Sequence, residues 1–241
     1  MNYYLESLGC PKNLVDAKGM ARLLKHLGHL PVDDPQNAQV LIVNTCGFIE
    51  DARQESIGEL RQLARQKRSD QVLIAAGCLS QRWGDSLTEV VPGLDALLGT
   101  RRWNEIGTLV QDLQAGRGTQ PKSYLSLPGE PILAADSSDP RTAEQGASAY
   151  LKIADGCSAP CAFCAIPLIK GPAVSRPPED VISDAIYLVQ QGAREIILIA
   201  QDTTAYGRDR GERDALPERA RGILDAGPGV AWRGGMGAAP G

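Results

Sequence analysis

The chain of 241 residues is long enough for one large or two modest domains, each with its own hydrophobic core. Its composition, 43% hydrophobic and 22% charged, is ordinary for a soluble globular protein. The formal net charge of −4 at pH 7 argues against nucleic-acid binding through the overall field, although it does not exclude a local basic patch.

The ends and the cysteine content indicate where the protein works. The N-terminal residues have neither a basic nor an apolar leader pattern. The longest apolar runs, around residues 72–76 and 196–200, are too short to span a bilayer. Six cysteines in such a chain indicate metal binding or catalysis rather than a disulfide framework. We therefore expect a cytoplasmic protein that has no membrane partner.

The first strand and helix are predicted near the N-terminus. Residues 3–8 read as a short strand that ends at Gly9 and Cys10. Apolar residues then recur with the period of a helix, for which Asn13 is the candidate N-terminal cap and Gly28 the end. The apolar residues of this helix are Met20, Leu23, Leu24 and Leu27.

Two more strand–helix units follow. Residues 40–43 predict a strand that leads to Cys46, and residues 72–76 predict a strand that leads to Cys78. Amphipathic helices follow both strands, with apolar positions at Ile57, Leu60, Ala64, Leu87 and Val90. Continuous apolar strands that alternate with such helices predict an α/β domain with a parallel sheet covered on both faces.

Three cysteines occupy equivalent positions in these units. Cys46 follows Cys10 by 36 residues, and Cys78 follows Cys46 by 32, so each step is one strand–helix unit. The carboxyl ends of parallel strands share one sheet edge, where open α/β sheets bind ligands. A lone cysteine is often only a small buried residue, but three at this edge predict a metal cluster with one open coordination position.

Residues 115–148 separate two predicted domains. This segment is rich in Gly, Pro, Ser and Asp and has no sustained periodicity, so we expect a linker with at most one short hairpin around residues 124–133. The N-terminal domain is then 1–114 and the second domain 149–241. In the second domain, strands are predicted at residues 150–154 and 195–200, with a helix between them after residues 176–178.

A second set of cysteines, Cys157, Cys161 and Cys164, is packed into one loop. Thiolates this close cannot all form disulfides, but they can converge on one metal centre. A 4Fe–4S cluster usually takes four cysteines, so three ligands leave one iron open for chemistry. Zinc is the competing interpretation, but it would favour a second ligand pair downstream, and the only histidines, His26 and His29, lie far upstream.

This loop, with Phe163 before its last cysteine, resembles the signature of the radical S-adenosylmethionine (SAM) superfamily. The resemblance implies an incomplete (β/α) partial TIM barrel for residues 149–241. It also implies that SAM binds the open iron and is cleaved to a 5′-deoxyadenosyl radical, which abstracts hydrogen from an unactivated carbon. Phe163 is then expected to lie at the cofactor.

Residues 7–13, 44–49 and 77–82 resemble the three segments of the methylthiotransferase N-terminal domain. The likeness covers about residues 1–210. It implies SAM and two 4Fe–4S clusters, with all six cysteines as metal ligands. The ligands of one cluster would be Cys10, Cys46 and Cys78, and those of the other Cys157, Cys161 and Cys164.

Within this family, residues 9–13 and 44–49 resemble the branch that modifies a ribosomal protein. That branch adds a methylthio group to the β-carbon of an aspartate in small-subunit ribosomal protein number twelve, and an electron donor such as flavodoxin or ferredoxin is implied. Two alternatives stay open. One is a methylthiotransferase that acts on tRNA adenosine, and the other is a catalytically silent iron–sulfur or zinc-binding fragment.

The family likeness extends to Gln201 and Asp202, which follow the strand at 195–200 and are expected to hydrogen-bond SAM. Capping of a helix is the competing interpretation for both. The chain departs from the family at Lys170-Gly171-Pro172, where Arg-Gly-Lys is usual, so one basic group beside the cluster loop is missing. We expect weaker anion or substrate contacts there, without loss of the cluster. From Arg219 onward Arg, Gly, Ala and Pro dominate in place of an apolar third strand, so we expect a truncated barrel with an open edge.

Overall fold

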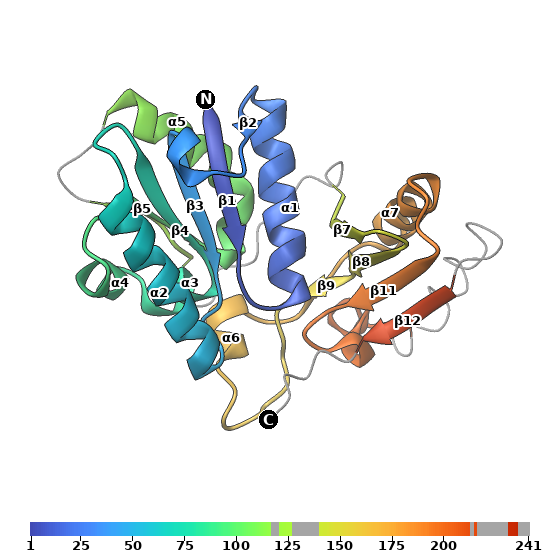
Figure 1. The fold of residues 1–241 in the computed structure, drawn as a ribbon. Coiled ribbons are helices and arrows are strands. Elements are labelled where there is room, and N and C mark those ends of the chain that lie inside the picture. The colour runs from blue at the N-terminus through green and yellow to red at the C-terminus, as the bar shows by residue number, and fades with distance from the viewer. Residues whose placement is uncertain (117–120, 127–139, 213–214, 216–230, 236–241) are drawn as a thin grey trace. The chain divides into compact units, whose positions relative to one another are not determined.

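A computed structural model of the chain describes residues 1–116, 121–126, 140–212, 215 and 231–235, without the side chains of 232–235. The chain divides into two compact units, Met1–Leu133 and Ala134–Gly241 (Figure 1). The boundary falls inside the segment that the sequence predicts as a linker. Each unit has its own sheet and its own buried apolar cluster.

The first unit is built on a six-stranded sheet in the order β2-β1-β3-β4-β5-β6, with every neighbouring pair parallel. The strands are β1 Asn2–Ser7, β2 Leu30–Pro31, β3 Val40–Thr45, β4 Val72–Gly77, β5 Ala96–Gly99 and β6 Lys122–Tyr124. Every residue of β3, β4 and β5 is buried. Such burial on both faces is what a continuous apolar strand in a parallel sheet requires, as the sequence indicates for β3 and β4.

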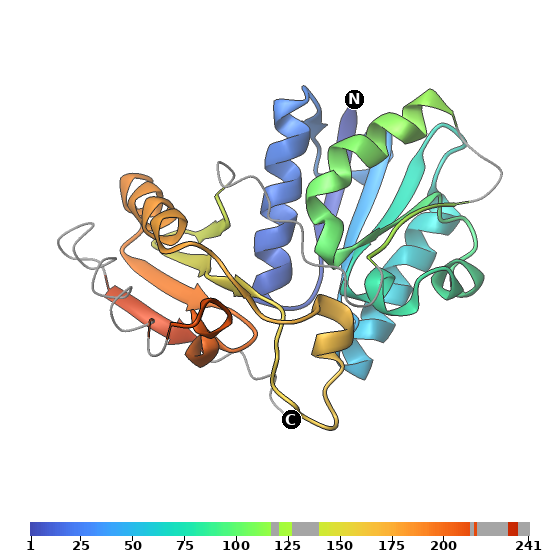
Figure 2. The same ribbon diagram turned by 180° about the vertical axis from the view of Figure 1, so that it is seen from behind.

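Helices cover both faces of this sheet (Figures 1 and 2). They are α1 Pro11–His26, α2 Glu50–Gln66, α3 Cys78–Trp83, α4 Ser86–Val90 and α5 Ile106–Ala115. On one face, Ile57 and Leu60 of α2 and Leu87 of α4 belong to one apolar cluster with Leu41 and Leu73 of the strands. Helices α1 and α5 contact each other. No helix within the described ranges has the length and apolar composition needed to cross a membrane.

The start of α1 differs from the prediction. The helix begins at Pro11, and Cys10 rather than Asn13 is its N-cap residue. Proline favours the first helical position because its φ angle is already helical and its missing N–H is not needed there. The prediction that Asn13 caps this helix is therefore wrong, and its side chain is left for other contacts. At the other end the helix stops at His26, two residues before Gly28, whose φ of +80° is left-handed.

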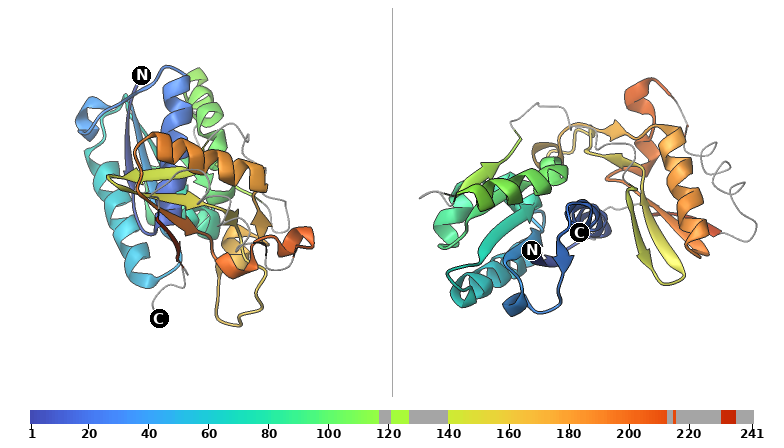
Figure 3. Two further views of the ribbon diagram at one scale, coloured as in Figure 1. Left: turned by 90° about the vertical axis from the view of Figure 1, so that its right-hand side faces the viewer. Right: turned by 90° about the horizontal axis from the view of Figure 1, so that it is seen from above.

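The second unit contains a four-stranded sheet in the order β12-β11-β8-β7 (Figures 1 and 3). Strands β8 Ser148–Lys152, β11 Glu195–Ile199 and β12 Ala231–Gly235 are parallel, and β7 Thr142–Gln145 runs antiparallel to β8. Helix α7 Pro178–Gln190 contributes Val181, Ala185 and Leu188 to the core. A short antiparallel pair, β9 Ala154–Asp155 and β10 Val174–Ser175, and helix α6 Ile166–Lys170 complete the described elements used below.

Two segments of the structure differ from the expectations. Residues 115–148 were expected to form a linker, yet β6 pairs with β5 and β7 pairs with β8. Strands of three or four residues show no readable period in a sequence. Most of the expected hairpin at 124–133 lies outside the described residues. Beyond Arg219, β12 pairs with β11 through its backbone although its sequence is not an apolar run, whereas residues 216–230 lie outside the described residues.

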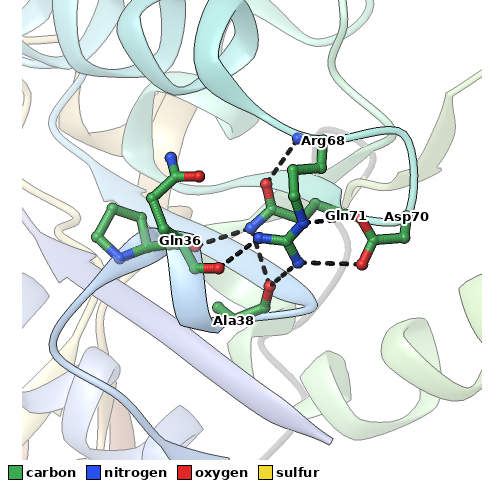
Figure 4. Close-up of polar contacts among 6 residues, drawn as sticks. Gln36, Ala38, Arg68, Asp70 and Gln71 are labelled. Carbon is green, nitrogen blue, oxygen red and sulfur yellow. Dashed lines mark hydrogen bonds and ion pairs between the residues drawn. The ribbon is translucent and has the colours of Figure 1, made fainter.

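Arg68, Asp70 and Gln71 form a group of polar side chains, here called the brace, near the amino-terminal ends of strands in the first sheet (Figure 4). The buried amide of Gln71 donates through Nε2 to the carbonyl oxygens of Pro35, at 2.7 Å, and Ala38, at 2.9 Å. Arg68 donates through Nη2 to the Ala38 carbonyl at 3.3 Å and pairs through Nε with Asp70 at 2.9 Å. The brace therefore ties the loop before β3 to the start of β4 through backbone acceptors.

Near this edge, buried His29 gives the unit a pH-dependent stability. Burial lowers the pKa of His29, and the positive charge of the amino terminus, 3.4 Å from Nδ1, lowers that pKa further. In the unfolded chain the imidazole has its ordinary pKa of about 6.5. As the pH falls below this value, the unfolded state takes up a proton that the folded state resists, so the free energy of unfolding decreases.

We expect urea denaturation to show a loss of stability between pH 7.5 and pH 5.5 that is smaller in His29→Gln. The control is His26→Gln, because His26 is exposed at the end of α1, and it should retain the pH dependence of the wild type. The same pH dependence in wild type and His29→Gln would contradict this assignment.

Candidate metal centres

The parallel sheet brings three cysteine-bearing loops to one edge. Strands β1, β3 and β4 are neighbours, with Ser7 paired to Asn44 and Thr45 paired to Gly77 at the carboxyl ends. Cys46 directly follows β3, Cys78 directly follows β4, and Cys10 follows β1 after two residues. The positions expected to be adjacent from strand–helix spacing therefore follow adjacent, in-register strands.

Glycines beside these cysteines allow the loops to touch. A Cβ atom on Gly9, directly before Cys10, would lie 2.8 Å from Cβ and 3.3 Å from Sγ of Cys46. A Cβ atom on Gly47 would lie 2.8 Å from the carbonyl carbon of Cys78. The Cys46 loop is thus in van der Waals contact with both other loops, and neither contact has room for a side chain.

Two side chains position Cys46 through its backbone. Ser56 of α2, fully buried, accepts a hydrogen bond from the Cys46 amide at 3.0 Å through its hydroxyl. Arg82 of α3 donates through Nη1 to the Gly47 carbonyl at 2.6 Å. Neither residue was identified from the sequence as a site residue. Arg82 lies in the third motif segment, but nothing in that segment indicates a contact with the second.

The thiol side chains are not arranged as a set of metal ligands, although the loops at the sheet edge are in contact. None of the six cysteines forms a disulfide bond; Cys46 and Cys78 are buried, and Cys10 is half-buried. Within the described part of the chain, no group of three or more His, Cys, Asp or Glu side chains is arranged to hold a metal ion. The loops converge, whereas the side-chain orientations do not form a ready ligand shell.

The second cysteine set lies on a loop that is closed at its base. The β9–β10 pair joins the two ends of the segment, and the Cys157 amide donates to the Gly171 carbonyl at 3.0 Å. Gly156 has a left-handed φ of +70°, and a Cβ there would lie 1.9 Å from the Pro172 carbonyl oxygen. Only glycine therefore allows the chain to turn into the loop at this point.

The side chains of this loop face solvent. Cys161 is exposed, while Cys157 and Cys164 are half-buried. Phe163 is 90% exposed and Leu168, in α6, is 81% exposed. Phe163 is thus not part of the hydrophobic core, and its expected role at SAM stays a prediction.

A buried charged cluster lies at the foot of the loop. Asp155, two residues before Cys157, contacts Lys152 Nζ at 2.5 Å, Arg141 Nη2 at 3.3 Å and Lys170 Nζ at 3.7 Å. All three cations are buried. Lys170 begins the segment Lys170-Gly171-Pro172 that departs from the family's usual Arg-Gly-Lys, and it is therefore in the interior against a carboxylate.

Gln201 and Asp202, which were both expected to hydrogen-bond SAM, differ in their contacts. Asp202 caps the short 3-10 helix Thr203–Ala205, because its Oδ1 accepts from the amide of Thr204 at 3.0 Å and from its hydroxyl at 2.6 Å. The capping interpretation therefore describes the observed contacts of Asp202. Gln201 is half-buried directly before it, after the end of β11, and its role at SAM stays a prediction.

The contact between the edge loops can be tested at Gly47. We expect Gly47→Ala to lower the free energy of unfolding by about 1–3 kcal/mol, because its Cβ would force the Cys46 and Cys78 loops apart. Gly58→Ala, on an exposed turn of α2 with no atom within 4 Å of the new Cβ, is the control and should raise stability by about 0.5–1 kcal/mol. Equal effects of the two substitutions in urea denaturation would show that the loops do not touch.

The base of the second loop can be tested at Gly156. Gly156→Ala and Gly146→Ala both place an alanine at a left-handed φ, +70° and +65°, which costs about 1–2 kcal/mol. Only Gly156 meets a carbonyl oxygen, whereas nothing lies within 4 Å at Gly146. We therefore expect Gly156→Ala to destabilise the protein clearly more in thermal unfolding. A loss no larger than that of Gly146→Ala would contradict the close packing at the loop base.

Comparison with solved structures identifies the fold. The chain is similar to the radical S-adenosylmethionine methyltransferase TsrM from Kitasatospora setae, with a TM-score of 0.51, 14% identity and coverage of 93% of this chain and 51% of that one. It is also similar to OxsB, a cobalamin-dependent S-adenosylmethionine radical enzyme, with a TM-score of 0.53, 9% identity and coverage of 93% and 36%. At these identities the likeness concerns the α/β fold alone.

Sequence comparison gives a closer relationship. Residues 2–99 match the model of the family described as "Uncharacterized protein family UPF0004". The ribosomal protein uS12 methylthiotransferase RimO of Chloroflexus aurantiacus is 43% identical over an alignment of 242 positions that covers 96% of this chain and 53% of that protein. The RimO of Herpetosiphon aurantiacus is 43% identical over 93% of this chain and 52% of that protein. The chain thus spans about half the length of these relatives, and it belongs to the RimO-like family.

Proposed function

We propose that the chain forms the metal-binding part of a radical-SAM methylthiotransferase that adds a methylthio group to the β-carbon of an aspartate in ribosomal protein uS12. The support is the name of the relatives at 43% identity, together with two separate three-cysteine sets. The observation that carries the proposal is the contact among the loops of Cys10, Cys46 and Cys78 at one sheet edge. A protein with one metal centre would have no need of this second set.

The donor atoms present fit iron–sulfur clusters. Each set offers three thiols within one unit, and soft thiolate ligands favour such clusters over the hard cations that oxygen donors bind. At the sheet edge, Gly9 and Gly47 leave the three cysteine-bearing loops in contact, so the three thiols belong to adjoining segments of backbone. At the second loop, the solvent-facing Cys161 leaves the set open to an incoming cluster.

The chain's own residues would then have separate tasks. Cys157, Cys161 and Cys164 would ligate one cluster and leave an iron for SAM, while Phe163 and Gln201 would contact SAM. Cys10, Cys46 and Cys78 would ligate the other cluster. The clusters and SAM supply the radical and sulfur-transfer chemistry when bound. Asp202 is the weaker candidate for SAM, because its Oδ1 already accepts two hydrogen bonds from Thr204.

The remaining partners follow from this reaction. The substrate would be uS12, and the electrons would come from a donor such as flavodoxin or ferredoxin in the cytoplasm. The relatives' name specifies a ribosomal protein and not tRNA, so the tRNA alternative has no support of its own. Because the chain spans about half of the length of these relatives, the alternative is a catalytically silent iron–sulfur protein, and the substrate experiment distinguishes the two.

The two-centre proposal predicts a definite iron content. After anaerobic reconstitution we expect about eight irons per chain, four for each cluster. Replacing Cys10, Cys46 and Cys78 together by alanine should halve this value, and so should replacing Cys157, Cys161 and Cys164. Only the second replacement should abolish 5′-deoxyadenosine formation from SAM under reducing conditions. About four irons in the wild type, lost with one set alone, would remove the other centre from the proposal.

The substrate is tested by mass spectrometry. The reconstituted chain, a reductant, SAM and uS12 should give uS12 the mass of one added methylthio group on an aspartate. A tRNA incubated in parallel should be unchanged. Full iron content without any modification of uS12 would assign the chain to the silent iron–sulfur class.

A further inference from the structure

One side chain contacts all three cysteine-bearing loops at the sheet edge. Asn13, 1% exposed in the first turn of α1, donates through Nδ2 to the Leu8 carbonyl at 3.0 Å and to the Thr45 carbonyl at 2.9 Å. Leu8 lies on the loop that leads to Cys10, and Thr45 directly precedes Cys46. On its other side, Asn13 Oδ1 accepts from the Cys78 thiol at 3.5 Å.

The strands alone do not determine how these loops are spaced. The ladder between β1 and β3 ends at the pair Ser7 and Asn44, and the ladder between β3 and β4 ends at Thr45. All three cysteines lie beyond these last pairs, so other contacts must hold them. The carboxamide of Asn13 spans the three loops with its two donors and its acceptor.

Backbone contacts keep Asn13 itself in place. Its amide donates to the Cys10 carbonyl at 2.9 Å, and the Asn44 side chain donates through Nδ2 to the Asn13 carbonyl at 2.7 Å. Asn44 is the last residue of β3 in register with β1. The position of the carboxamide is therefore coupled to the sheet on one side and to Cys10 on the other.

We propose that Asn13 is a positioning residue for the sheet-edge metal centre and sets the spacing of Cys10, Cys46 and Cys78 without being a ligand. This inference rests on the proposed function, because it requires a metal centre at that edge. Partners that orient ligands in this way commonly change metal affinity by about 10–100-fold when they are replaced.

A matched amide at the opposite edge of the same sheet separates positioning from stability. Gln71 is also 1% exposed and also donates through its amide nitrogen to two backbone carbonyls, those of Pro35 and Ala38 (Figure 4). It lies at the start of β4, whereas the cysteines follow the strand ends. Gln71→Ala removes the same kind of buried hydrogen bonds, but at the opposite end of the strands from the thiols.

The experiment measures Co²⁺ binding by the full chain through cobalt–thiolate absorption. Cys157, Cys161 and Cys164 are replaced by alanine in every sample, so that only the edge thiols contribute. We expect Asn13→Ala to weaken Co²⁺ binding by about 10–100-fold and Gln71→Ala to change it by less than about twofold. Asn13→Leu keeps a side chain of similar size but lacks the two N–H donors and the acceptor, and it should weaken binding as much as Asn13→Ala does.

The outcomes distinguish the positioning role of Asn13 from the existence of the edge metal centre. Unchanged Co²⁺ affinity in Asn13→Ala would overturn the positioning role and leave the proposed centre standing. No binding even with Asn13 intact would reject the edge centre, and the role of Asn13 with it. Equal losses in Asn13→Ala and Gln71→Ala would mean that general destabilisation, not spacing, governs binding. If Asn13→Ala does not fold, Asn13→Ser, which keeps one donor, provides the same comparison and should fall between the wild type and Asn13→Leu.

Discussion

The parallel hydrogen-bond ladder of β1, β3 and β4 is the constraint on which the first site depends. Parallel strands release the chain at the same edge, so loops separated by a whole strand–helix unit emerge side by side. Cys10, Cys46 and Cys78 owe their proximity to this ladder and not to any local motif. Gly9 and Gly47 then let the loops approach closely, against the Cys46 side chain and the Cys78 backbone respectively, and the buried amide of Asn13 joins the three loops.

The second cysteine set obtains its proximity in a different way. Cys157, Cys161 and Cys164 are close in sequence, and the fold needs only to close the loop beneath them. The β9–β10 pair and Gly156 do so, and the ion cluster around Asp155 anchors the foot of the loop. Buried ions are costly to desolvate unless they are paired, and Asp155 is a carboxylate that contacts three buried cations. The cysteines of this set are therefore close because of the local sequence, whereas the buried charges beneath them carry a desolvation cost.

The sequence was most informative where periodicity and spacing coincide. Apolar runs predicted β3 and β4, and the steps of 36 and 32 residues between the cysteines, each one strand–helix unit, predicted that their loops follow neighbouring strands. The same reasoning failed for Asn13, which was interpreted as a helix cap although Pro11 already begins the helix. Its actual partners, Leu8 and Thr45, are set by tertiary packing that no local pattern displays.

Short or unusual strands were also beyond the reach of the sequence. Strand β6 has three residues and β12 is rich in glycine, so neither has an apolar period. Both are held by backbone pairing with a neighbour that is already buried, β5 and β11 respectively. The sequence also left two interpretations of Asp202 open, helix capping and SAM binding. Both use the same carboxylate, and the capping contact becomes visible only in the three-dimensional structure.

The unequal burial of the two cysteine sets has a practical consequence for handling the protein in air. Oxidation of a thiol to sulfenic and then sulfinic acid depends on exposure, and Cys161 faces solvent while Cys46 and Cys78 are shielded. Damage by dissolved oxygen should therefore begin at the solvent-facing loop. A preparation that has lost one of its thiol sets in storage would still keep the shielded one, and its residual metal capacity would report on the sheet edge alone.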